Sequence, residues 1–501
     1  MCGIFGIVTK EKQQLGPTLI EAGERLSYRG YDTVGAATIP KKGEIDLRKD
    51  VGKIQAVAEN LNFVEMAGDR AILQLRWATF GAPSQINAQP HLDSDGDMVG
   101  AHNGNVVNNV ELRQQFIAEG MTVRSENDGE SCVHAVERYV DQGYDMVAAI
   151  RLADDDIEGD YAFVIGKVGD DRLYAIKKGS GLVAGVTADA TCIASDLPSI
   201  LPITRDIVRL EDGEIITFWA DGFEICKVED GSIVNRQPEL VEESMESVQK
   251  GGYAHFMLKE IHEQAQVAGE LIQMLDNSPD IGPMIERLEA ARNIYLIACG
   301  TSYHASLLGS VYFSRLAGRP TIPVLAPQFI AQYGPAVGPG DVGIFVSQSG
   351  ETKDVLNAIE VAEGRGMGIL GLVNVVGSSL TRLSDYHLPL TCGYEISVPA
   401  TKTFSNQVIA FLYLTMRMGG IDTAPLENLP LWIDRVLEAV EKQTAAVSGY
   451  LSRWDDLYCL GYGLTYPIAL EAALKLKEIT YAHCEGMLST EFKHGPLSAV
   501  T

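Results

Sequence analysis

The sequence lacks several features that would place it in other classes of protein. It has no run of 18 apolar residues, which excludes a membrane-spanning helix of the usual kind. Its eight cysteines include no C-x-x-C pair and no His/Cys cluster at zinc spacing. We therefore expect free thiols in a reducing cytoplasm, and no metal or other cofactor. The start, MCGIFGIVTK, has no basic region and too short an apolar stretch for a signal peptide.

Positive charge is also scarce. Asp and Glu number 67 against 40 Lys and Arg, which gives a formal net charge of −27. Such a surface repels nucleic acid and anionic membranes, so neither is expected as a partner. An anionic ligand would have to be captured locally, by backbone amides and hydroxyl groups.

The length of 501 residues predicts about three domains. Residues 2–235 hold short β-type runs separated by Gly and Asp turns, with helical patterns at 17–27 and 128–142. This mixture indicates an α+β domain with antiparallel sheets. The strands are expected at 4–8, 71–78, 161–168, 172–178 and 214–228.

The sequence pattern changes after residue 235. Residues 236–285 begin with a polar, Glu- and Ser-rich stretch and are interpreted as a linker and a helical lead-in. Beyond them apolar strands alternate with helices, which is typical of doubly wound α/β domains. We expect one at 286–420 and a second, incomplete one at 421–501. A weak repeat supports the pair, because YLIACGTSYHASL (295–307) is similar to YCLGYGLTYPIAL (458–470).

Position 2 is a cysteine, and removal of Met1 would leave its α-amine free. An α-amine has a pKa near about 8, so it can accept the proton of the thiol on the same residue. The nucleophile and its base would then need no histidine. Taken alone, however, Cys2 is more simply a small buried residue at the start of a strand.

Four further motifs favour Cys2 as a nucleophile. They are polar, glycine-rich loops: RLSYRGYDTVGAA (25–37), LRWATFGAPSQINAQPH (75–91), AHNGNV (101–106) and SENDGES (125–131). With MCGIFGIV they resemble, in order and spacing, the glutaminase domain of the N-terminal-nucleophile (class II) glutamine amidotransferases. The resemblance implies the four-layer α+β sandwich of that class.

The resemblance also implies the chemistry. Cys2 attacks the side-chain amide of glutamine, and Asn103 forms the oxyanion hole with the backbone N–H of Gly104. Two positions depart from the family pattern, because Phe80 and Gln89 each stand where the family usually has a histidine. Neither is the nucleophile or an oxyanion donor, so we expect the chemistry to survive and details of the pocket to differ.

Four residues bind the glutamine substrate by the same resemblance. Arg76 pairs with its carboxylate, a geometry that the planar guanidinium suits. Asp128 holds its α-amine. Trp77 and Thr79 line the pocket, and Trp77 is also placed to gate ammonia. Taken alone, Arg76 would be interpreted as a surface ion pair and Trp77 as a core residue.

Two loops in the second half carry hydroxyl groups at the start of a helix. CGTS (299–302) and SQSGET (347–352) each follow an apolar strand. A helix N-terminus with small hydroxyl residues presents N–H and O–H donors to an anion. Each loop alone is more simply a helix cap. Two of them at the carboxyl ends of neighbouring strands mark the usual ligand crevice of an open α/β sheet.

Both loops resemble the sugar isomerase (SIS) domain, and SVPATKTFSNQ (397–407) fits the same resemblance. It implies that the loops bind the phosphate of a sugar phosphate. The implied phosphate ligands are Ser302, Ser347, Gln348, Ser349 and Thr352, and the implied sugar contacts are Thr301 and Val398.

A helical pattern near the end of the chain puts Glu471, Lys475 and Glu478 on one face. Such a stripe is usually a solvated row of ion pairs. The run ALKLKEI and the following STEFKHGP, however, resemble the isomerising aminotransferases that act on fructose 6-phosphate. By that resemblance Glu478 moves a proton between C1 and C2, Lys475 assists it, and His494 opens the sugar ring.

The whole chain therefore resembles these isomerising enzymes. That implies transfer of glutamine nitrogen, as ammonia, to fructose 6-phosphate by a homodimer, giving glucosamine 6-phosphate and glutamate for UDP-N-acetylglucosamine synthesis. The alternatives are a glutaminase-linked SIS enzyme that aminates or deaminates another sugar phosphate, and a non-catalytic sugar-phosphate sensor. Intact Cys2, Arg76 and Asn103 disfavour the sensor. The SIS loops disfavour phosphoribosyl pyrophosphate amidotransferases and asparagine synthetases, which share only the first half.

The family pattern continues beyond the final HGPLSAVT, and its later tail carries the lysine that forms an imine with the sugar. Two interpretations stay open: the sequence is a fragment, or it is a shortened relative. For a fragment we expect ammonia release from glutamine without formation of the amino sugar.

Overall fold

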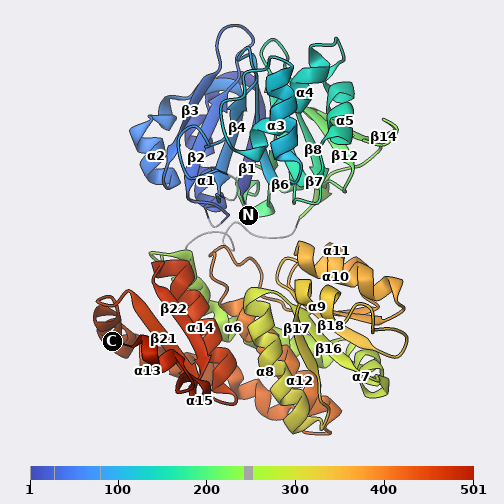
Figure 1. Cartoon of the computed structure of the whole chain (residues 1–501), viewed down its shortest axis with the longest axis vertical. Helices are drawn as coiled ribbons and strands as arrows, with labels where there is room; N and C mark the ends of the chain where they lie inside the picture. The colour runs from blue at the N-terminus through green and yellow to red at the C-terminus, as the bar shows by residue number, and fades with distance from the viewer. Residues whose placement is uncertain (1, 28, 79–80, 242–251, 501) are drawn as a thin grey trace. The chain divides into compact units, whose positions relative to one another are not determined.

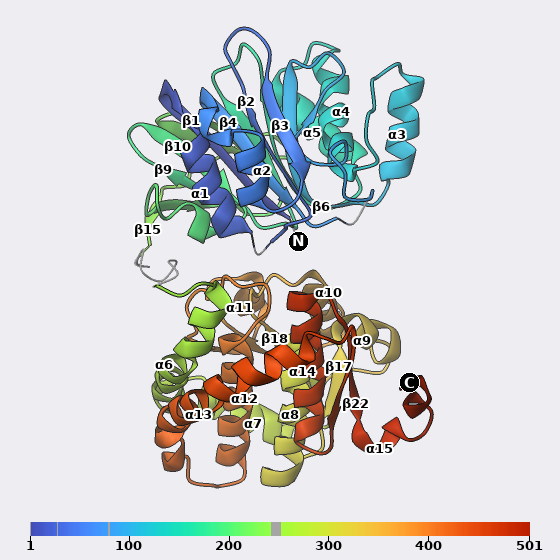
Figure 2. The same cartoon turned by 90° about the vertical axis from the view of Figure 1, so that its left-hand side faces the viewer.

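The computed structural model describes residues 2–27, 29–78, 81–241 and 252–500. Its contacts divide the chain into two compact units, Met1–Val248 and Gln249–Thr501, and each is described by itself. Figures 1 and 2 show the elements of both units from two directions.

The N-terminal unit contains two sheets, and the first begins directly after Cys2. Its strands are β1 (Gly3–Gln14), β2 (Thr33–Thr38), β3 (Asp46–Val51), β4 (Ala67–Arg76), β9 (Val183–Val186), β10 (Ala190–Ala194), β11 (Asp206–Arg209) and β15 (Glu239–Leu240). In space they run β15-β11-β9-β10-β1-β4-β2-β3, and the pairs are antiparallel.

The second sheet carries the strand with the predicted oxyanion residues. Its strands are β5 (His91–Leu92), β6 (Met98–Val106), β7 (Gly159–Lys167), β8 (Leu173–Lys178), β12 (Glu214–Trp219), β13 (Gly222–Lys227) and β14 (Ile233–Val234). Their order is β14-β13-β12-β8-β7-β6-β5, again with antiparallel pairs.

The two sheets pack face to face, and helices cover their outer faces (Figure 1). Ile4, Val8 and Ile72 of the first sheet share one buried core with Val164 and Phe218 of the second. This is the predicted four-layer α+β sandwich. The first sheet is covered by α1 (Gly16–Leu26), α2 (Ile54–Asn60) and the 3₁₀ turn η1 (Phe63–Glu65), the second by α3 (Asn109–Ala118), α4 (Asp128–Val140) and α5 (Met146–Asp156), and η2 (Leu197–Ser199) follows β10.

The run expected as one strand at 214–228 forms two strands, β12 and β13, which pair as an antiparallel hairpin. Two further sequence predictions differ from this unit in extent. The strand expected at 4–8 continues to Gln14, because its polar end resumes pairing with β4 after a register shift. The stretch interpreted as a linker overlaps β15, which adds to the edge of the first sheet through β11. Pairing with a partner strand decides both cases, and neither segment has the apolar alternation that marks a strand in sequence.

The C-terminal unit is built on a parallel sheet, as predicted. Its strands are β16 (Ile294–Ala298), β17 (Ile322–Leu325), β18 (Val342–Ser347), β19 (Gly368–Val373) and β20 (Tyr386–Pro389). Their order is β17-β16-β18-β19-β20, with parallel neighbours throughout. Both faces are buried, which explains the continuous apolar runs of these strands.

Helices cover both faces of this sheet. One face packs against α6 (Phe256–Asn277), α7 (Ile281–Ala290) and α12 (Lys402–Met418), and α8 (Gly300–Leu316) joins them through Phe313. The other face packs against α9 (Ala326–Gln332), α10 (Lys353–Gly364) and α11 (Ser379–Leu383). This is the doubly wound α/β arrangement that the alternating pattern predicts.

The last part of the chain repeats the strand–helix motif. A two-stranded parallel sheet is formed by β21 (Asp456–Gly461) and β22 (His483–Leu488), with α14 (Thr465–Thr480) between them in sequence. The contacts do not divide the C-terminal unit further, so the boundary predicted near residue 420 stays a prediction. The other elements are η4 (Ala424–Asn428), α13 (Leu429–Leu451), α15 (Ser489–Phe492) and η5 (Pro496–Ala499). The helices in the described part of the chain are too short or too polar to span a bilayer.

Candidate active sites

The cysteine predicted as nucleophile lies beside the end of a neighbouring strand. Cys2 stands directly before β1, which pairs with β4, so Trp77, the residue after β4, comes next to it. The backbone N–H of Trp77 points at the thiol, with 3.3 Å between Trp77 N and Cys2 Sγ. Burial raises the pKa of the Cys2 thiol, and the Trp77 amide and the positive chain terminus oppose this effect. A nearby base is therefore needed to activate the thiol.

The two predicted oxyanion residues are neighbours on β6. Nδ2 of Asn103 donates to the carbonyl oxygen of Cys2 at 2.9 Å. Gly104 has φ of +120°, and a β-carbon there would lie 2.1 Å from the carbonyl oxygen of Asp160. Only glycine fits this close approach of two backbones. The structure thus brings β6 and the predicted nucleophile together.

Two buried charges predicted to bind glutamine lie close to the cysteine. Arg76, the last residue of β4, and Asp128, the first residue of α4, are 1% and 2% exposed. Burial lowers the pKa of the Arg76 guanidinium, and the charges of Cys2 and Asp128 oppose that shift. The Asp128 carboxylate also accepts the N–H of Val106 at 3.1 Å. A guanidinium and a carboxylate near Cys2 are complementary to the carboxylate and the α-ammonium of an amino acid.

Trp77, predicted to line the pocket, is partly exposed at the surface of the unit. Its ring packs on Tyr31, with 5.3 Å between the ring centroids and 58° between the planes. Thr79, the other predicted lining residue, and its neighbour Phe80 lie outside the described residues.

Gln89, one of the two departures from the family pattern, supports the backbone before Asn103. The side chain is buried, its Oε1 accepts the N–H of His102 at 2.6 Å, and its Nε2 donates to the carbonyl oxygen of His102 at 3.0 Å. The side-chain amide of Gln89 therefore makes the same pair of hydrogen bonds with His102 that a residue of a neighbouring antiparallel strand would make.

A buried ion network holds the loop in front of α4. Glu130 accepts the backbone N–H groups of Arg124 and Ser125 at 2.7 and 2.6 Å. His134, one turn further along α4, lies 3.6 Å from Glu130 and 2.5 Å from Glu137. Burial by itself would lower the pKa of His134, but the two carboxylates outweigh it and raise the pKa to about 9.

This network is expected to stabilise the protein in a defined pH range. The pKa of His134 is raised above its ordinary 6.5, and the pKa of Glu130 is lowered from 4.5 to about 2, so the stabilisation is complete between pH 4.5 and 6.5. It is lost as the pH rises through about 9 or falls through about 2. Replacing His134 with glutamine should lower the free energy of unfolding by on the order of 1–3 kcal/mol between pH 4.5 and 6.5 and by much less above the raised pKa. Scanning calorimetry across this range measures the difference, with His483→Gln, an exposed histidine, as control. A loss that does not change with pH would contradict the interpretation.

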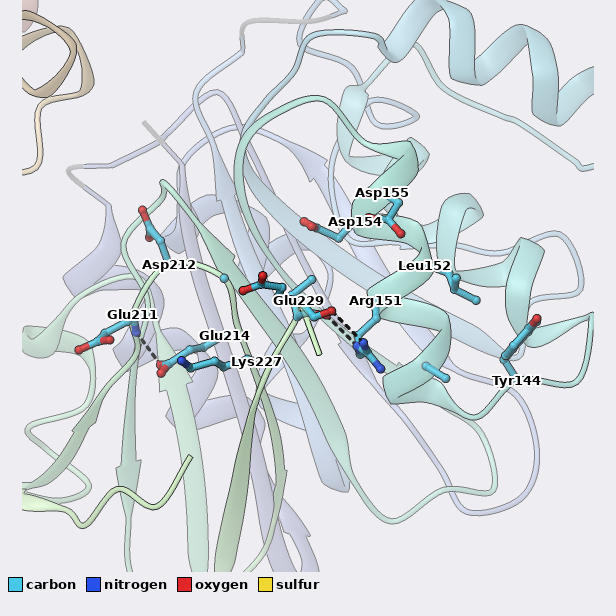
Figure 3. Close-up of a pocket in the computed structure, with 13 residues that line it drawn as sticks. Tyr144, Arg151, Leu152, Asp154, Asp155, Glu211, Asp212, Glu214, Lys227 and Glu229 are labelled. Atoms are coloured by element: carbon cyan, nitrogen blue, oxygen red, sulfur yellow. Dashed lines mark hydrogen bonds between the residues drawn. The ribbon is translucent and has the colours of Figure 1, made fainter. Parts of the chain in front are cut away.

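A separate hollow of about 600 Å³ lies beside α5 in the N-terminal unit (Figure 3). Its arginine is already bonded, because Arg151 donates to the carbonyl oxygens of Val228 at 2.7 Å and Glu229 at 3.2 Å. None of the predicted site residues lines this hollow. Its acidic lining would repel an anionic substrate, so we assign it no part in the reaction. The carboxylates are Asp154, Asp155, Glu211, Asp212, Glu214 and Glu229.

In the C-terminal unit the two predicted phosphate loops reach the same edge of the sheet. β16 and β18 are neighbours, and the chain leaves them in opposite directions, to β17 on one side and β19 on the other. This is a topological switch point, where open α/β sheets bind ligands beyond the carboxyl ends of their strands. The loops at 299–302 and 347–352 follow these two strands.

Hydrogen bonds within the second loop fix its conformation. Ser347 Oγ lies 2.8 Å from Thr352 Oγ1 and accepts the N–H of Gly350 at 3.0 Å. Gly350 has φ of +70°, a conformation that favours glycine. Ser349 Oγ accepts the N–H of Glu351 at 3.1 Å. The carbonyl oxygen of Gln348 accepts the backbone N–H groups of Asn374 and Val375, in the loop after β19, at 3.2 and 3.3 Å.

The other predicted contacts are held by neighbouring helices. Ser302 lies in the first turn of α8, and its Oγ accepts Nε2 of Gln407 from α12 at 2.9 Å. Val398 is half-buried in a loop that Glu260 of α6 holds, because this carboxylate accepts the N–H of Ser397 at 3.1 Å. Side chains of α12 and α6 therefore hold the segments that contain Ser302 and Val398 in place.

Glu471, Lys475 and Glu478 form a connected cluster and not a solvated stripe. Lys475 Nζ lies 3.2 Å from the Glu471 carboxylate and 2.7 Å from the Glu478 carboxylate. It also donates to Thr301 Oγ1 at 3.0 Å, and Thr301 donates to Glu471 at 2.9 Å. The predicted sugar contact on α8 is thus joined to the predicted proton-transfer residues on α14.

His304 belongs to this cluster although the sequence analysis did not identify it. Its Nδ1 lies 2.7 Å from the carboxylate of Glu471. Burial by itself would raise the pKa of Glu471, but His304 and Lys475 outweigh it and lower the pKa. The i, i+3 spacing of Thr301 and His304 is the signal that could have found it. His494, by contrast, is exposed, and among the described residues no hydrogen bond joins its ring to the cluster.

Metal ligation finds no support in the described part of the chain. No group of three or more His, Cys, Asp or Glu side chains there is placed to hold an ion, and all eight cysteines are free thiols.

Two known protein-family domains match the two halves of the chain. A glutamine amidotransferase domain matches residues 76–202, and a SIS domain matches 287–417 and 450–501. Fold and sites together define a class: an N-terminal-nucleophile glutamine amidotransferase whose second half is a SIS unit.

Curated relatives show to which family within this class the chain belongs. The glutamine–fructose-6-phosphate aminotransferase [isomerizing] of Methanothermobacter thermautotrophicus is 39% identical over 100% of this chain and 83% of its own length. The enzyme of the same name from Aquifex aeolicus is 38% identical over the same shares. The solved C-terminal domain of the Francisella tularensis enzyme is 31% identical, with a TM-score of 0.45, over 50% of this chain and 75% of that one. The chain belongs to the isomerizing glutamine–fructose-6-phosphate aminotransferase family.

Proposed function

We propose that this chain transfers the amide nitrogen of glutamine, as ammonia, to fructose 6-phosphate with isomerisation, giving glucosamine 6-phosphate and glutamate. One arrangement carries the proposal. A cysteine lies beside amide donors in one unit, and hydroxyl-lined loops lie at the switch point of a parallel sheet in the other. The names of the curated relatives support fructose 6-phosphate as the acceptor.

In the glutamine step the α-amine of Cys2, free after removal of Met1, takes the proton of the thiol. The sulfur attacks the amide carbon, and the carbonyl electrons move to the oxygen, which Asn103 Nδ2 and the N–H of Gly104 stabilise. The oxyanion collapses, the C–N bond breaks, and the proton on the α-amine passes to the departing nitrogen, so ammonia leaves. Water then hydrolyses the thioester to glutamate and restores the thiol.

The buried charges bind glutamine by its two charged groups. Arg76 takes the carboxylate and Asp128 takes the α-ammonium, while Trp77 lines the pocket. Burial strengthens both interactions, because the effective dielectric constant is lower than in water.

The C-terminal unit binds and isomerises the sugar phosphate. The loops take the phosphate, Thr301 and Val398 contact the sugar, and His494 opens the ring. Glu478 carries a proton between C1 and C2, and Lys475, which lies between Glu471 and Glu478, assists it. The phosphate ligands are Ser302, Ser347, Gln348, Ser349 and Thr352.

We also propose a homodimer that works in the cytoplasm without a cofactor and binds neither nucleic acid nor membranes. The net charge of −27 supports the last point, since such a surface repels polyanions. The family resemblance supports the homodimer.

Glutamine labelled with ¹⁵N in its amide tests the proposal. The protein is expected to release glutamate and ammonia, and with fructose 6-phosphate present to form ¹⁵N-labelled glucosamine 6-phosphate, measured by mass spectrometry. Absence of glutamate release would refute the glutaminase site. Glutamate release in a protein that binds the sugar phosphate but forms no amino sugar is the outcome expected of a fragment, and would refute the transfer step for this chain.

A further inference from the structure

Ser195 joins the two sheets of the N-terminal unit at the glutaminase site. It directly follows β10, is 4% exposed, and belongs to none of the motifs that identified the site. Its Oγ accepts the backbone N–H of Ile4, at the start of the nucleophile strand, at 2.8 Å. The same oxygen accepts Nδ2 of Asn103, from the other sheet, at 2.7 Å.

These bonds account for both hydrogens of the Asn103 amide nitrogen. One is donated to Ser195 Oγ at 2.7 Å and the other to the carbonyl oxygen of Cys2 at 2.9 Å. An oxyanion that forms on the substrate must therefore take over the hydrogen now donated to Cys2. The bond to Ser195 can persist through this exchange and keeps the amide plane from rotating.

The segment that carries Ser195 is itself held in place. The next residue, Asp196, pairs with Arg29 at 2.9 Å and accepts the hydroxyl of Ser199 at 2.7 Å. The backbone N–H of Ser195 donates to the carbonyl oxygen of Ile4 at 3.0 Å. The acceptor oxygen thus has a fixed position relative to β1, as a group that orients another side chain requires.

We propose that Ser195 is a positioning residue for glutamine hydrolysis, which acts by holding the Asn103 amide as an oxyanion donor. The inference rests on the proposed glutaminase function. A buried serine with two donors on its oxygen could also serve stability alone, so its test must separate the rate of the reaction from the integrity of the fold.

Ser195→Ala is expected to lower kcat for glutamine hydrolysis by roughly 10–100-fold, because Asn103 loses the partner that orients it. KM for glutamine should change little, since Arg76 and Asp128 are untouched. Thr191→Val is the matched control: it removes another buried hydroxyl, on β10, that has no hydrogen-bond partner among the described residues. This control should keep the parent rate.

A double-mutant cycle shows whether Ser195 acts through Asn103. In an Asn103→Ala protein the amide is already absent, so adding Ser195→Ala should cause no further loss of kcat. A second loss of equal size in that background would overturn the proposal. So would a Ser195→Ala protein with the parent kcat.

Alkylation of Cys2 by iodoacetamide supplies the second readout. This displacement needs the thiolate but no oxyanion donor, so Ser195→Ala should react within about twofold of the parent rate. The same measurement reports whether the site is folded. A loss of alkylation as large as the loss of hydrolysis would mean that Ser195 only keeps the nucleophile strand in place, and would overturn the proposal. A parent protein that does not hydrolyse glutamine refutes the proposed function itself, before any variant is made.

Discussion

Replacing Cys2 with alanine is expected to lower glutamine hydrolysis by roughly 10⁴-fold or more, because the carbon–sulfur bond of the intermediate can no longer form. The same protein should still bind fructose 6-phosphate, since the phosphate loops belong to a separate compact unit. Glutamate release and sugar-phosphate titration measure the two outcomes.

The matched control is Cys226→Ala, which removes another cysteine of the same unit, on β13. It should keep the parent rate. Mass analysis of the amino terminus adds an independent check, because the mechanism needs the α-amine of Cys2. Fully active protein that retains Met1, or a Cys2→Ala protein that still hydrolyses glutamine, would contradict the assignment.

Replacing both Ser347 and Ser349 with alanine is expected to weaken fructose 6-phosphate binding by roughly 10²–10⁴-fold, from two charge-assisted hydrogen bonds of about 1.5–3 kcal/mol each. Ser347 also accepts the N–H of Gly350 and contacts Thr352, so its loss loosens the loop as well. In a chain with net charge −27, local donors have to provide this affinity. Calorimetric titration with fructose 6-phosphate and with inorganic phosphate measures it.

Ser314→Ala serves as control, because this exposed serine lies near the other end of α8. The control should bind both ligands as the parent does, and the double variant should keep the parent rate of glutamine hydrolysis. Unchanged affinity in the double variant would refute the phosphate site.

Much of the fold was predictable because its signals are local. β16 and β18 coincide with apolar runs, since a strand buried on both faces has no polar alternation. Helix α4 begins within the acidic, polar motif at 125–131, where Asn127 caps its first turn. Where a segment depends on a partner strand, as at the end of β1 and at β15, the local pattern was insufficient.

Residue types and ordered motifs were enough to predict the chemistry of this protein: a cysteine at position 2, an arginine and an aspartate in ordered motifs, and hydroxyl groups at two helix starts. Which of these groups meet, and which neighbours hold them, depended on how the sheets and helices pack. Ser195 and Asn103 are 92 residues apart in the chain, and His304 and Glu471 are 167 apart. Side-chain type and local periodicity are properties of neighbouring residues, whereas a contact between distant residues depends on strand order and register, which form only when the sheets pack.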